Sequence, residues 1–399
     1  MGRETVEPVY NVLLLDETND GLAEGIGRSL LLAGRFDIHC LTESVGRLRL
    51  HRAKTTEADL SSGAALLRSV KEYVSDHHID VVLPIQEPML ARVAEVRDEL
   101  CSLAKVAPAP SAEMLARVHD KWQCRQLFIE AGIDVPSAWS LADLPTVRAD
   151  LEAFREPVLL KPVLGRGGKG IQRFDSGADL LAAVDSSQID LGGKPELWMA
   201  EELIEGTNVN VCLLAMDGDL IGTAGWRVVV SQGHAFRSAG VLLDYYGDDR
   251  LQEFARRFAV VTNWSGPADI DCRMTLDGRV KALEVNPRFW QTTLGPVSLG
   301  SNFPAATCLL AVGEEVAPLR CPTGLWLNIE GIIQDWRNVR ALIPALGRSI
   351  RGAHPKLLAV DPRFELDFIR FHTARQANGR IRQLLVRLKG RRPRPREGR

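Results

Sequence analysis

A hairpin predicted between positions 269 and 288 sets two acidic residues face to face. Its turn is Asp277-Gly278, a pair typical of two-residue hairpin loops, with strand-like alternation on both sides. A two-residue loop sets position 276 opposite position 279, and the same register sets Asp271 opposite Glu284. Side chains directly across a ladder stand roughly 4.5–5.5 Å apart at Cβ, so facing carboxylates repel each other. Such a pair persists most easily when a cation lies between the two side chains.

The same register adds an amide and a guanidinium to the two carboxylates. It sets Asp269 opposite Asn286, and period-2 alternation brings Arg288 onto the face that carries Glu284 and Asn286. Oxygen ligands suit Mg²⁺, which keeps several waters and usually also binds substrate phosphates; Mn²⁺ accepts similar ligands. We therefore expect Asp271, Glu284 and Asn286 to bind a metal and Arg288 to bind a phosphoryl group. For a lone hairpin, a solvated polar face of a sheet explains the same residues.

A second chemical signal is a glycine-rich stretch that follows the apolar run ending at Lys161. Glycine lets backbone N–H groups approach phosphate oxygens closely, and lysine adds positive charge. The stretch contains Gly165, Gly167, Gly168, Lys169 and Gly170. A phosphate-binding loop is the natural interpretation.

Three common phosphate-binding motifs do not fit this stretch. A dinucleotide-binding fold needs a helix to open at the glycines, whereas 171–174 has the character of a strand. A Walker A loop needs Lys-Ser/Thr after the final glycine, where this chain has Ile171. A protein kinase needs H-R-D and D-F-G, and neither occurs. A glycine-rich hairpin between two strands, folded over a triphosphate, remains.

Strand and helix signals alternate over residues 9–110, which indicates a doubly wound parallel sheet. The predicted strands are Val9–Leu15, Phe36–Leu41 and Ile79–Ile85, and the predicted helices are Leu22–Leu32, Ala64–Ser75 and Met89–Leu100. The Ala-Pro-Ala-Pro run at 107–110 then marks a domain boundary.

Beyond this boundary the sequence predicts antiparallel strands joined by tight turns. Ser111 is the expected cap of a helix that leads to His119-Asp-Lys121. Residues 157–203 read as strand, glycine-rich turn, strand, helix and strand. A hairpin over 209–230 turns at Asp217-Gly218, and helices are expected at 251–263 and 297–311.

Composition and charge place the chain among reduced, cytoplasmic proteins. The formal net charge of −2 gives no reason to expect nucleic-acid binding. No apolar run approaches the ~18–20 residues that span a membrane, and the first residues lack a signal-peptide core. The seven cysteines are scattered without a C-x-x-C, as expected of free thiols.

The C-terminal end is strongly basic. Arg and Lys dominate from residue 370 onward, and prolines interrupt 389–399, which we therefore predict to be a disordered tail. We interpret this tail as solvated, with contact to an anionic membrane surface or to nucleic acid as the alternative.

In their order, these motifs resemble the ATP-grasp superfamily, specifically its carboxylate–amine (or thiol) ligases. The resemblance covers most of the chain. It implies an α/β (α+β) fold in which a pre-ATP-grasp doubly wound parallel sheet, 1–110, precedes a two-subdomain ATP-grasp fold, 111–315. Within the latter, about 150–205 would be a mobile lid. A C-terminal helical or mixed extension, 316–388, would lead to the tail.

The resemblance also implies roles for individual residues. Lys121 and Lys161 would be the two ATP lysines of the family, and Gly165 to Gly170 its mobile phosphate loop. The segment 198–206 resembles the hinge strand, whose backbone around 201–203 would bind the adenine edge. The metal positions of the family match Asp271, Glu284 and Asn286, and its phosphate-contacting arginine matches Arg288. The residues expected at the nucleotide are Lys121, Lys161, Gly165, Gly167, Gly168, Lys169, Gly170, Glu201, Glu202, Leu203, Glu205 and Asn208.

Several contacts stay open at this point. The family often has an acid two residues after the hinge glycine to hold the ribose; here Asn208 occupies that position, with Glu205 as a substitute. Glu201 and Glu202 alternate along their strand, so at most one is expected to face the nucleotide.

Other basic residues are candidates for substrate contacts. Arg227, at the end of a strand, joins Arg288 as a candidate catalytic residue that bridges phosphate. His234 and Arg237 are candidates to face an acceptor carboxylate, with an ordinary surface-loop role as the alternative.

The function implied is ATP-dependent ligation. A carboxylate would be activated as an acyl phosphate and joined to an amine, with ADP and phosphate released. The substrates would be small molecules, the cofactors ATP and Mg²⁺, and a homodimer is left open. A bicarbonate-phosphorylating enzyme, like carbamoyl-phosphate synthase or a carboxylase, is one alternative. A non-catalytic ATP sensor on the same fold is another.

Overall fold

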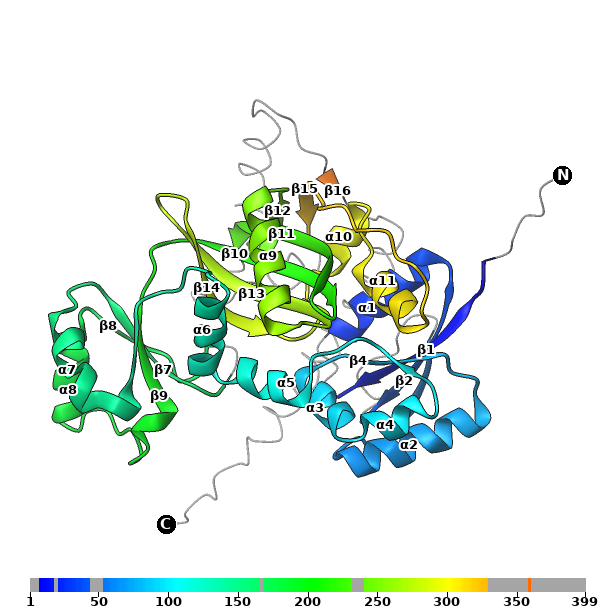
Figure 1. Cartoon of the computed structure of the whole chain (residues 1–399), viewed down its shortest axis with the longest axis horizontal. Coiled ribbons are helices and arrows are strands. Elements are labelled where there is room, and N and C mark those ends of the chain that lie inside the picture. Colours follow the sequence, from blue (N-terminus) through cyan, green and yellow to red (C-terminus); the bar gives the residue numbers. More distant parts are fainter. Residues whose placement is uncertain are drawn as a thin grey trace, which may run out of the picture.

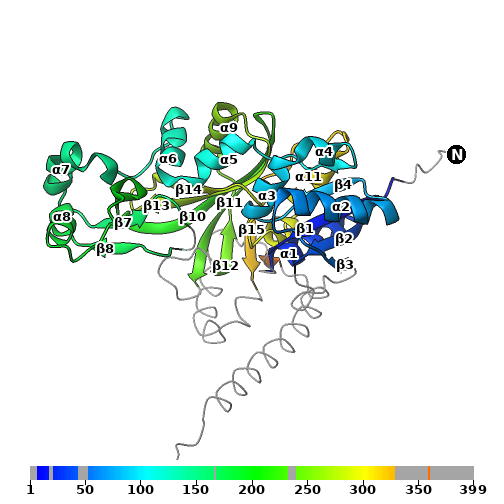
Figure 2. The same cartoon turned by 90° about the horizontal axis from the view of Figure 1, so that it is seen from below.

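The computed structural model describes residues 7–17, 21–43, 53–165, 168–231, 240–328 and 358–359. Within them the strands form three sheets of five, seven and four strands. The seven-stranded sheet occupies the middle of the molecule, with the five-stranded sheet at one end and the four-stranded sheet at the other (Figures 1 and 2). The predicted α/β class is therefore confirmed.

The five-stranded sheet is parallel, in the order β3-β2-β1-β4-β5. Its strands are β1 (Tyr10–Asp16), β2 (Phe36–Thr42), β3 (Lys54–Glu57), β4 (Val81–Pro84) and β5 (Lys105–Val106). Helix α1 (Leu22–Ala33) packs on one face, and α2 (Gly63–Asp76), α3 (Glu87–Glu95) and α4 (Arg97–Cys101) pack on the other. The expected parallel sheet is confirmed.

Two details of this region differ from the prediction. The short edge strands β3 and β5 were not predicted. The helix expected over Met89–Leu100 is divided into α3 and α4 at Val96, whose φ of −128° and ψ of 27° are not helical.

The seven-stranded sheet has the order β14-β13-β10-β11-β12-β15-β16. Its strands are β10 (Gly206–Met216), β11 (Asp219–Ser231), β12 (Gly240–Tyr245), β13 (Gly266–Thr275), β14 (Val280–Asn286), β15 (Gly324–Leu327) and β16 (Leu358–Ala359). Helices α5 (Ala112–His119), α6 (Lys121–Glu130) and α9 (Asp249–Thr262) cover one face. The β10–β11 turn at Asp217-Gly218 and the Ser111 cap of α5 are as predicted.

The opposite face of this sheet shares a hydrophobic core with the parallel sheet. Side chains from β1 and α1 pack in one cluster with Trp226, Tyr245, Phe289, Trp290 and residues of α11 (Phe303–Ala311). The helix expected over 297–311 is interrupted: α10 (Leu294–Ser298) ends before α11 begins. Because the core is continuous, the two larger sheets pack as one body.

The four-stranded sheet forms a separate small layer, in the order β6-β9-β7-β8. It contains β6 (Ala138–Ser140), β7 (Val158–Pro162), β8 (Gln172–Phe174) and β9 (Trp198–Glu202), which pair antiparallel. Helices α7 (Leu144–Ala153) and α8 (Gly177–Asp185) cover its outer face with their own core (Figure 1).

The carboxylate hairpin β13–β14 has the predicted pairs but not the predicted turn. Asp271 pairs with Glu284 and Asp269 with Asn286, as expected. The loop is one residue longer than predicted, since Thr275 N–H donates to Arg279 O at 2.8 Å. Gly278 has a φ of 83°, as in three-residue hairpin loops. The register then shifts between Asp271 and Cys272, which restores the predicted pairing.

Most of the segment predicted to form a C-terminal extension and a basic tail lies outside the described residues. Strands β15 and β16 add to the edge of the seven-stranded sheet. The basic tail, 389–399, lies outside the described part of the chain, as do His234 and Arg237. No helix in the described part is long and apolar enough to cross a membrane.

Candidate nucleotide-binding site

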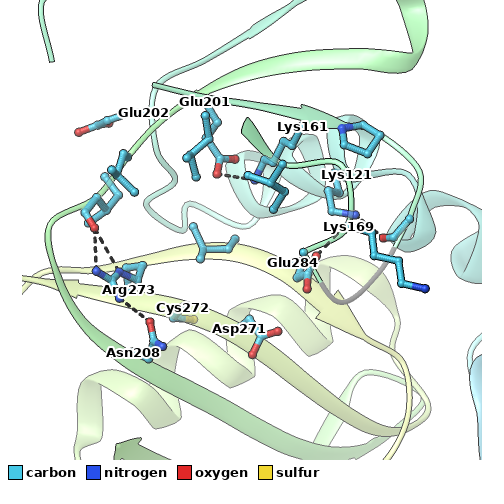
Figure 3. A pocket seen from close by; sticks show the side chains of 18 of the residues that line it. Lys121, Lys161, Lys169, Glu201, Glu202, Asn208, Asp271, Cys272, Arg273 and Glu284 are labelled. Carbon is cyan, nitrogen blue, oxygen red and sulfur yellow. Dashed lines mark hydrogen bonds and ion pairs between the residues drawn. The ribbon is translucent and has the colours of Figure 1, made fainter. Parts of the chain in front are cut away.

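A cavity lies between the four-stranded sheet and the seven-stranded sheet (Figure 3). Its polar walls carry most of the predicted nucleotide residues. They include Lys121, Lys161, Gly165, Gly168, Lys169, Glu201, Glu202, Asn208, Asn210, Asp271, Arg273 and Glu284. Figure 3 shows Lys161 and Glu201 on one side of the cavity, with Asp271 and Glu284 on the other.

Lys121 lies at the first position of α6, where it connects the two sides of the cavity. Asp120 caps this helix by accepting from Gln123 N–H, which fixes the start of the helix. The Lys121 N–H donates to Val163 O at 2.9 Å. Its Nζ donates to Gly165 O at 2.5 Å and lies 3.6 Å from Glu284 Oε2. The side chain therefore contacts both the glycine loop and the carboxylate hairpin.

Lys161 projects from β7 and forms a buried ion pair with Glu201 on β9. The two side chains are only 7% and 6% exposed, so each charge depends on the other. Since β7 and β9 are neighbouring strands, the sheet itself holds the pair at the cavity wall.

The glycine loop adopts backbone conformations that favour glycine. Gly165, Gly168 and Gly170 have φ values of 131°, 71° and 80°. Gly165, Gly168 and the exposed Lys169 line the cavity, whereas Gly170 packs against Pro162. Gly167 lies outside the described residues.

Both hinge glutamates line the cavity, but their carboxylates differ: Glu201 pairs with Lys161 at the cavity wall, whereas Glu202 is bonded to Ser137 and Lys281. Glu202 accepts from Ser137 N–H at 2.9 Å and pairs with Lys281 at 3.0 Å. Burial alone raises the pKa of Glu202, but these hydrogen bonds outweigh it and hold the pKa below its ordinary value. The Leu203 N–H donates to Pro157 O at 2.8 Å, so this backbone N–H of the hinge already has a hydrogen-bond partner.

At the far end of the hinge, Arg273 holds the residue expected at the ribose. Its Nη1 donates to Asn208 Oδ1, and its Nε and Nη2 donate to Ile204 O at 3.1 and 3.0 Å. Burial lowers the pKa of the Arg273 guanidinium. Asn208 lines the cavity, whereas Glu205 is exposed and does not line it. Of the two residues considered for the ribose, only Asn208 therefore lies at the cavity wall.

The carboxylates on β13 are held together by amides. Asn210 on β10 donates through Nδ2 to Asp269 Oδ1 at 2.8 Å and to Asp271 Oδ1 at 2.6 Å. Asn286 Nδ2 donates to Asp271 Oδ2 at 3.2 Å. Burial, followed by the charges of Asp269 and Glu284, raises the pKa of Asp271 well above its ordinary value. This group of like charges lacks sufficient positive charge of its own.

A divalent cation fits this arrangement chemically. The donor set is two carboxylates and an amide, all oxygen ligands of the kind that hard cations prefer. The described residues contain no group of three or more His, Cys, Asp or Glu side chains placed to hold a metal ion, so waters, phosphate oxygens or an amide would have to complete its coordination. In addition, Asn210 Oδ1 is buried without a partner among the described residues, and a ligand or water at this wall would satisfy it.

Arg288 follows β14 and contacts Asn286, but neither of these two residues is among those that line the cavity. Its Nη2 donates to Asn286 Oδ1 at 3.0 Å, and its Nη1 donates to Phe289 O at 2.9 Å. Its Nε lies 3.2 Å from Glu87 Oε1 of α3.

Arg227 lies apart from this group, contrary to the sequence-based expectation. Its neighbour Trp226 pairs with Asn210, so alternation along β11 sends Arg227 to the opposite face of the sheet. There it pairs with Asp244 at 2.9 Å and lies over the Tyr246 ring. Sequence alone did not reveal which face of β11 would carry the site.

Two hydrogen-bonding cavity residues, Asn210 and Arg273, were not among the sequence candidates. Asn210 follows Asn208 by two positions, a spacing that places both on one face of a strand. That alternation was a usable signal. Arg273 offered none, because its role depends on the pairing of β10 with β13, which sets it opposite Asn208.

Comparison with known proteins agrees with the geometry. Residues 118–293 match the family model described as the ATP-grasp domain. The uncharacterized protein y4rH of Sinorhizobium fredii is 26% identical over 278 residues, or 62% of this chain. The chain spans about half the length (54%) of this curated relative.

Solved structures of ATP-grasp proteins share the fold. An L-amino acid ligase from Bacillus licheniformis matches with a TM-score of 0.58 and 18% identity, covering 80% of this chain and 79% of that one. N5-carboxyaminoimidazole synthetase from Staphylococcus aureus matches with a TM-score of 0.62 and 12% identity, covering 93% and 99%. At these low sequence identities, the structural similarity shows a shared fold and nothing more specific.

Proposed function

The chain belongs to the ATP-grasp superfamily, and from this premise we propose that it is an ATP-dependent ligase. It activates a carboxylate as an acyl phosphate and joins it to an amine. The observation that carries the proposal is the pair Asp271–Glu284, which faces a cavity that also contains Lys121 and Lys161. A sheet retains facing carboxylates at such a place when a ligand supplies the missing positive charge.

In this proposal the two sheets hold ATP between them. Lys121, Lys161 and the amides around Gly165 and Gly168 bind the phosphates, since they line one cavity. The hinge around 201–203 receives the adenine, and Asn208 binds the ribose. Arg227, on the opposite face of the sheet, has no part in the proposed reaction.

Asp271, Glu284 and Asn286 would hold Mg²⁺, or Mn²⁺ in its place. When bound, such a cation neutralises the negative charge that phosphates and carboxylates bring to one site. The chain itself contributes the ligand oxygens and, through Asn210, the hydrogen bonds that orient Asp271.

The reaction has two balanced steps. A carboxylate oxygen attacks the γ-phosphorus, the bond from that phosphorus to the β–γ bridging oxygen breaks, and ADP leaves. An amine nitrogen then attacks the acyl carbon, the carbon–oxygen bond to phosphate breaks, and the amine loses a proton. Positioning and charge stabilisation supply most of the rate in such transfers. In this proposal Arg288 stabilises the transferring phosphoryl group.

An acid-by-amine matrix tests the proposal. The purified chain is incubated with ATP, Mg²⁺ and each pair of compounds; ADP is measured and products are analysed by mass spectrometry. We expect ADP release that needs both compounds, with a product mass equal to their sum minus water. ADP release with bicarbonate and no amine would instead indicate a bicarbonate-phosphorylating enzyme. ATP binding without cleavage under any condition would indicate a sensor.

A further inference from the structure

We propose that Glu87, in the parallel-sheet domain, is a positioning residue for Arg288. This inference rests on the proposed function, because it gives the parallel sheet a part in holding the arginine that binds the transferring phosphoryl. The carboxylate of Glu87 lies 3.2 Å from Arg288 Nε. Glu87 begins α3 on the parallel sheet, and Arg288 follows β14 of the seven-stranded sheet, so only the tertiary fold brings the two residues together.

Three groups together fix the guanidinium of Arg288. Glu87 contacts Nε, Asn286 Oδ1 accepts from Nη2, and Phe289 O accepts from Nη1. An arginine side chain has five N–H donors, so these contacts leave donors for a phosphoryl oxygen. Of these three partners among the described residues, only Glu87 is charged. Its carboxylate holds the Nε edge of the Arg288 guanidinium and so sets the direction of that side chain.

Glu87 is itself held on a rigid element. It is the first residue of α3, and Pro88 follows it in the first turn. Its neighbour Gln86 donates to Asp16 at the end of β1 and accepts from Glu17 N–H at 3.1 Å. The carboxyl edge of the parallel sheet thus fixes the start of α3, and the Glu87 side chain is only 18% exposed.

The backbone that carries Arg288 is anchored in the hydrophobic core by the residues that follow it. The next two residues, Phe289 and Trp290, are each 1% exposed and belong to the core shared with β1 and α1. Both ends of the Glu87–Arg288 contact therefore sit on one packed body. A displacement of about 1 Å in a catalytic group can cost on the order of 10²-fold in rate, so this support matters for the phosphoryl transfer.

The test compares Glu87→Ala with a matched control, Glu99→Ala. Glu99 is an exposed residue of α4 in the same domain. We expect Glu87→Ala to lower kcat about tenfold while the KM for ATP changes less than twofold, since the misplaced group acts in the transition state. Glu87→Gln, which keeps an acceptor for Nε, should recover part of the rate. Glu99→Ala should match the wild type.

A double variant separates positioning from general stability. In an Arg288→Ala background, Glu87→Ala should lower kcat no further, because its effect passes through the missing guanidinium. An equal loss in both backgrounds, or an unchanged kcat in the single variant, would overturn the inference. The Nε–H resonance of Arg288 gives a readout that needs no turnover: it should move in Glu87→Ala and not in Glu99→Ala. A wild type that releases no ADP refutes the proposed function, whereas an unmoved resonance refutes the role of Glu87.

Discussion

At the scale of single residues, the candidate site depends on a surplus of negative charge. Asp269, Asp271 and Glu284 lie together, and among the described residues Lys121 forms an ion pair with Glu284 at 3.6 Å, while the charge of Arg288 acts on Asp269. Asn210 and Asn286 orient the carboxylates but add no charge. Hydrogen bonding alone therefore leaves the repulsion in place, and this is why a bound cation explains the arrangement better than a structural role does.

Glu284→Gln tests this charge argument. Glutamine keeps the size of the side chain, and 34% of the Glu284 side chain is exposed, so the fold should persist. Loss of one ligand charge should nearly abolish ATP cleavage. ADP release measures the cleavage, and circular dichroism checks that the variant is folded. Near-wild-type turnover in a folded variant would remove the hairpin from the active site.

Arg288→Ala distinguishes a catalytic arginine from a surface ion pair. If the guanidinium binds the transferring phosphoryl, its loss should raise the barrier by about 3–4 kcal/mol, by analogy with loss of one oxyanion donor. Affinity for ADP should change much less, and Lys should restore only part of the rate because it lacks the planar fork. An ordinary exposed pair would instead be worth about 0–1 kcal/mol of stability and no rate. Measurements of kcat and nucleotide Kd decide between the two.

The sequence predicted the site residues unevenly, for a physical reason. Period-2 alternation around the Asp277-Gly278 turn predicted the pair Asp271–Glu284, although a bulge is needed to offset the longer loop. It was not enough for Arg227, because the face of a lone strand is defined only by its neighbours. The pairing of Trp226 with Asn210 is a long-range contact, and it sends Arg227 to the other side.

At the scale of elements, the carboxylate hairpin reaches the predicted pairing by two compensating irregularities. The loop takes one more residue than Asp-Gly turns usually do, and the bulge near Leu283 adds one residue to β14. A bulge also increases the local twist of a strand, which helps to aim neighbouring side chains. Neither irregularity has a clear signature in the residue types, so the turn prediction was wrong even though the carboxylate pair was right.

Two glycines on this sheet predict different costs of substitution. A Cβ at Gly206, where φ is 150°, would lie 2.0 Å from Met274 O, so backbone would have to move. A Cβ at Gly278 has nothing within 4 Å and meets only the strain of its φ of 83°. We expect Gly278→Ala to cost about 1–2 kcal/mol of unfolding free energy. Gly206→Ala should cost about 3 kcal/mol or more.

Chemical denaturation of both variants measures this difference. Each variant also reports on function, since Gly206 joins the hinge to β10 and Gly278 lies at the hairpin tip. Equal losses of stability in the two variants would mean that the close approach of Gly206 to Met274 is not a constraint in solution.

Long elements of the fold were predictable, and short ones were not. Helices α1 and α2 and strands β1 and β2 follow from clear periodicity. Strand β3 has the sequence Lys-Thr-Thr-Glu with three of its four residues exposed, and β5 has only two residues. These edge strands form because β2 and β4 offer free backbone groups, a tertiary effect that local pattern does not contain.

At the scale of the whole molecule, the cavity lies between two parts that have separate hydrophobic cores. The five- and seven-stranded sheets share one core, whereas the four-stranded sheet has its own. Side-chain contacts across the cavity are few and polar, among them Glu202 with Lys281 and Lys121 with Gly165 O. A ligand that binds both parts would therefore add most of the contact between them.

This arrangement predicts how ligands should change the thermal stability. A nucleotide held by both parts binds the folded state only, and at 100 times its Kd it stabilises that state by about 2.7 kcal/mol. ADP with Mg²⁺ should therefore raise Tm by more than ADP with EDTA, and Mg²⁺ alone should do little, since phosphate oxygens complete its coordination. In Glu284→Gln the increase in Tm caused by Mg²⁺ should disappear, while the increase in Tm caused by ADP remains. Scanning calorimetry of the two proteins under the three conditions is the measurement. If Mg²⁺ alone raised Tm as much as the pair did, the carboxylates would form an independent metal site, and the coupling between metal and nucleotide would be wrong.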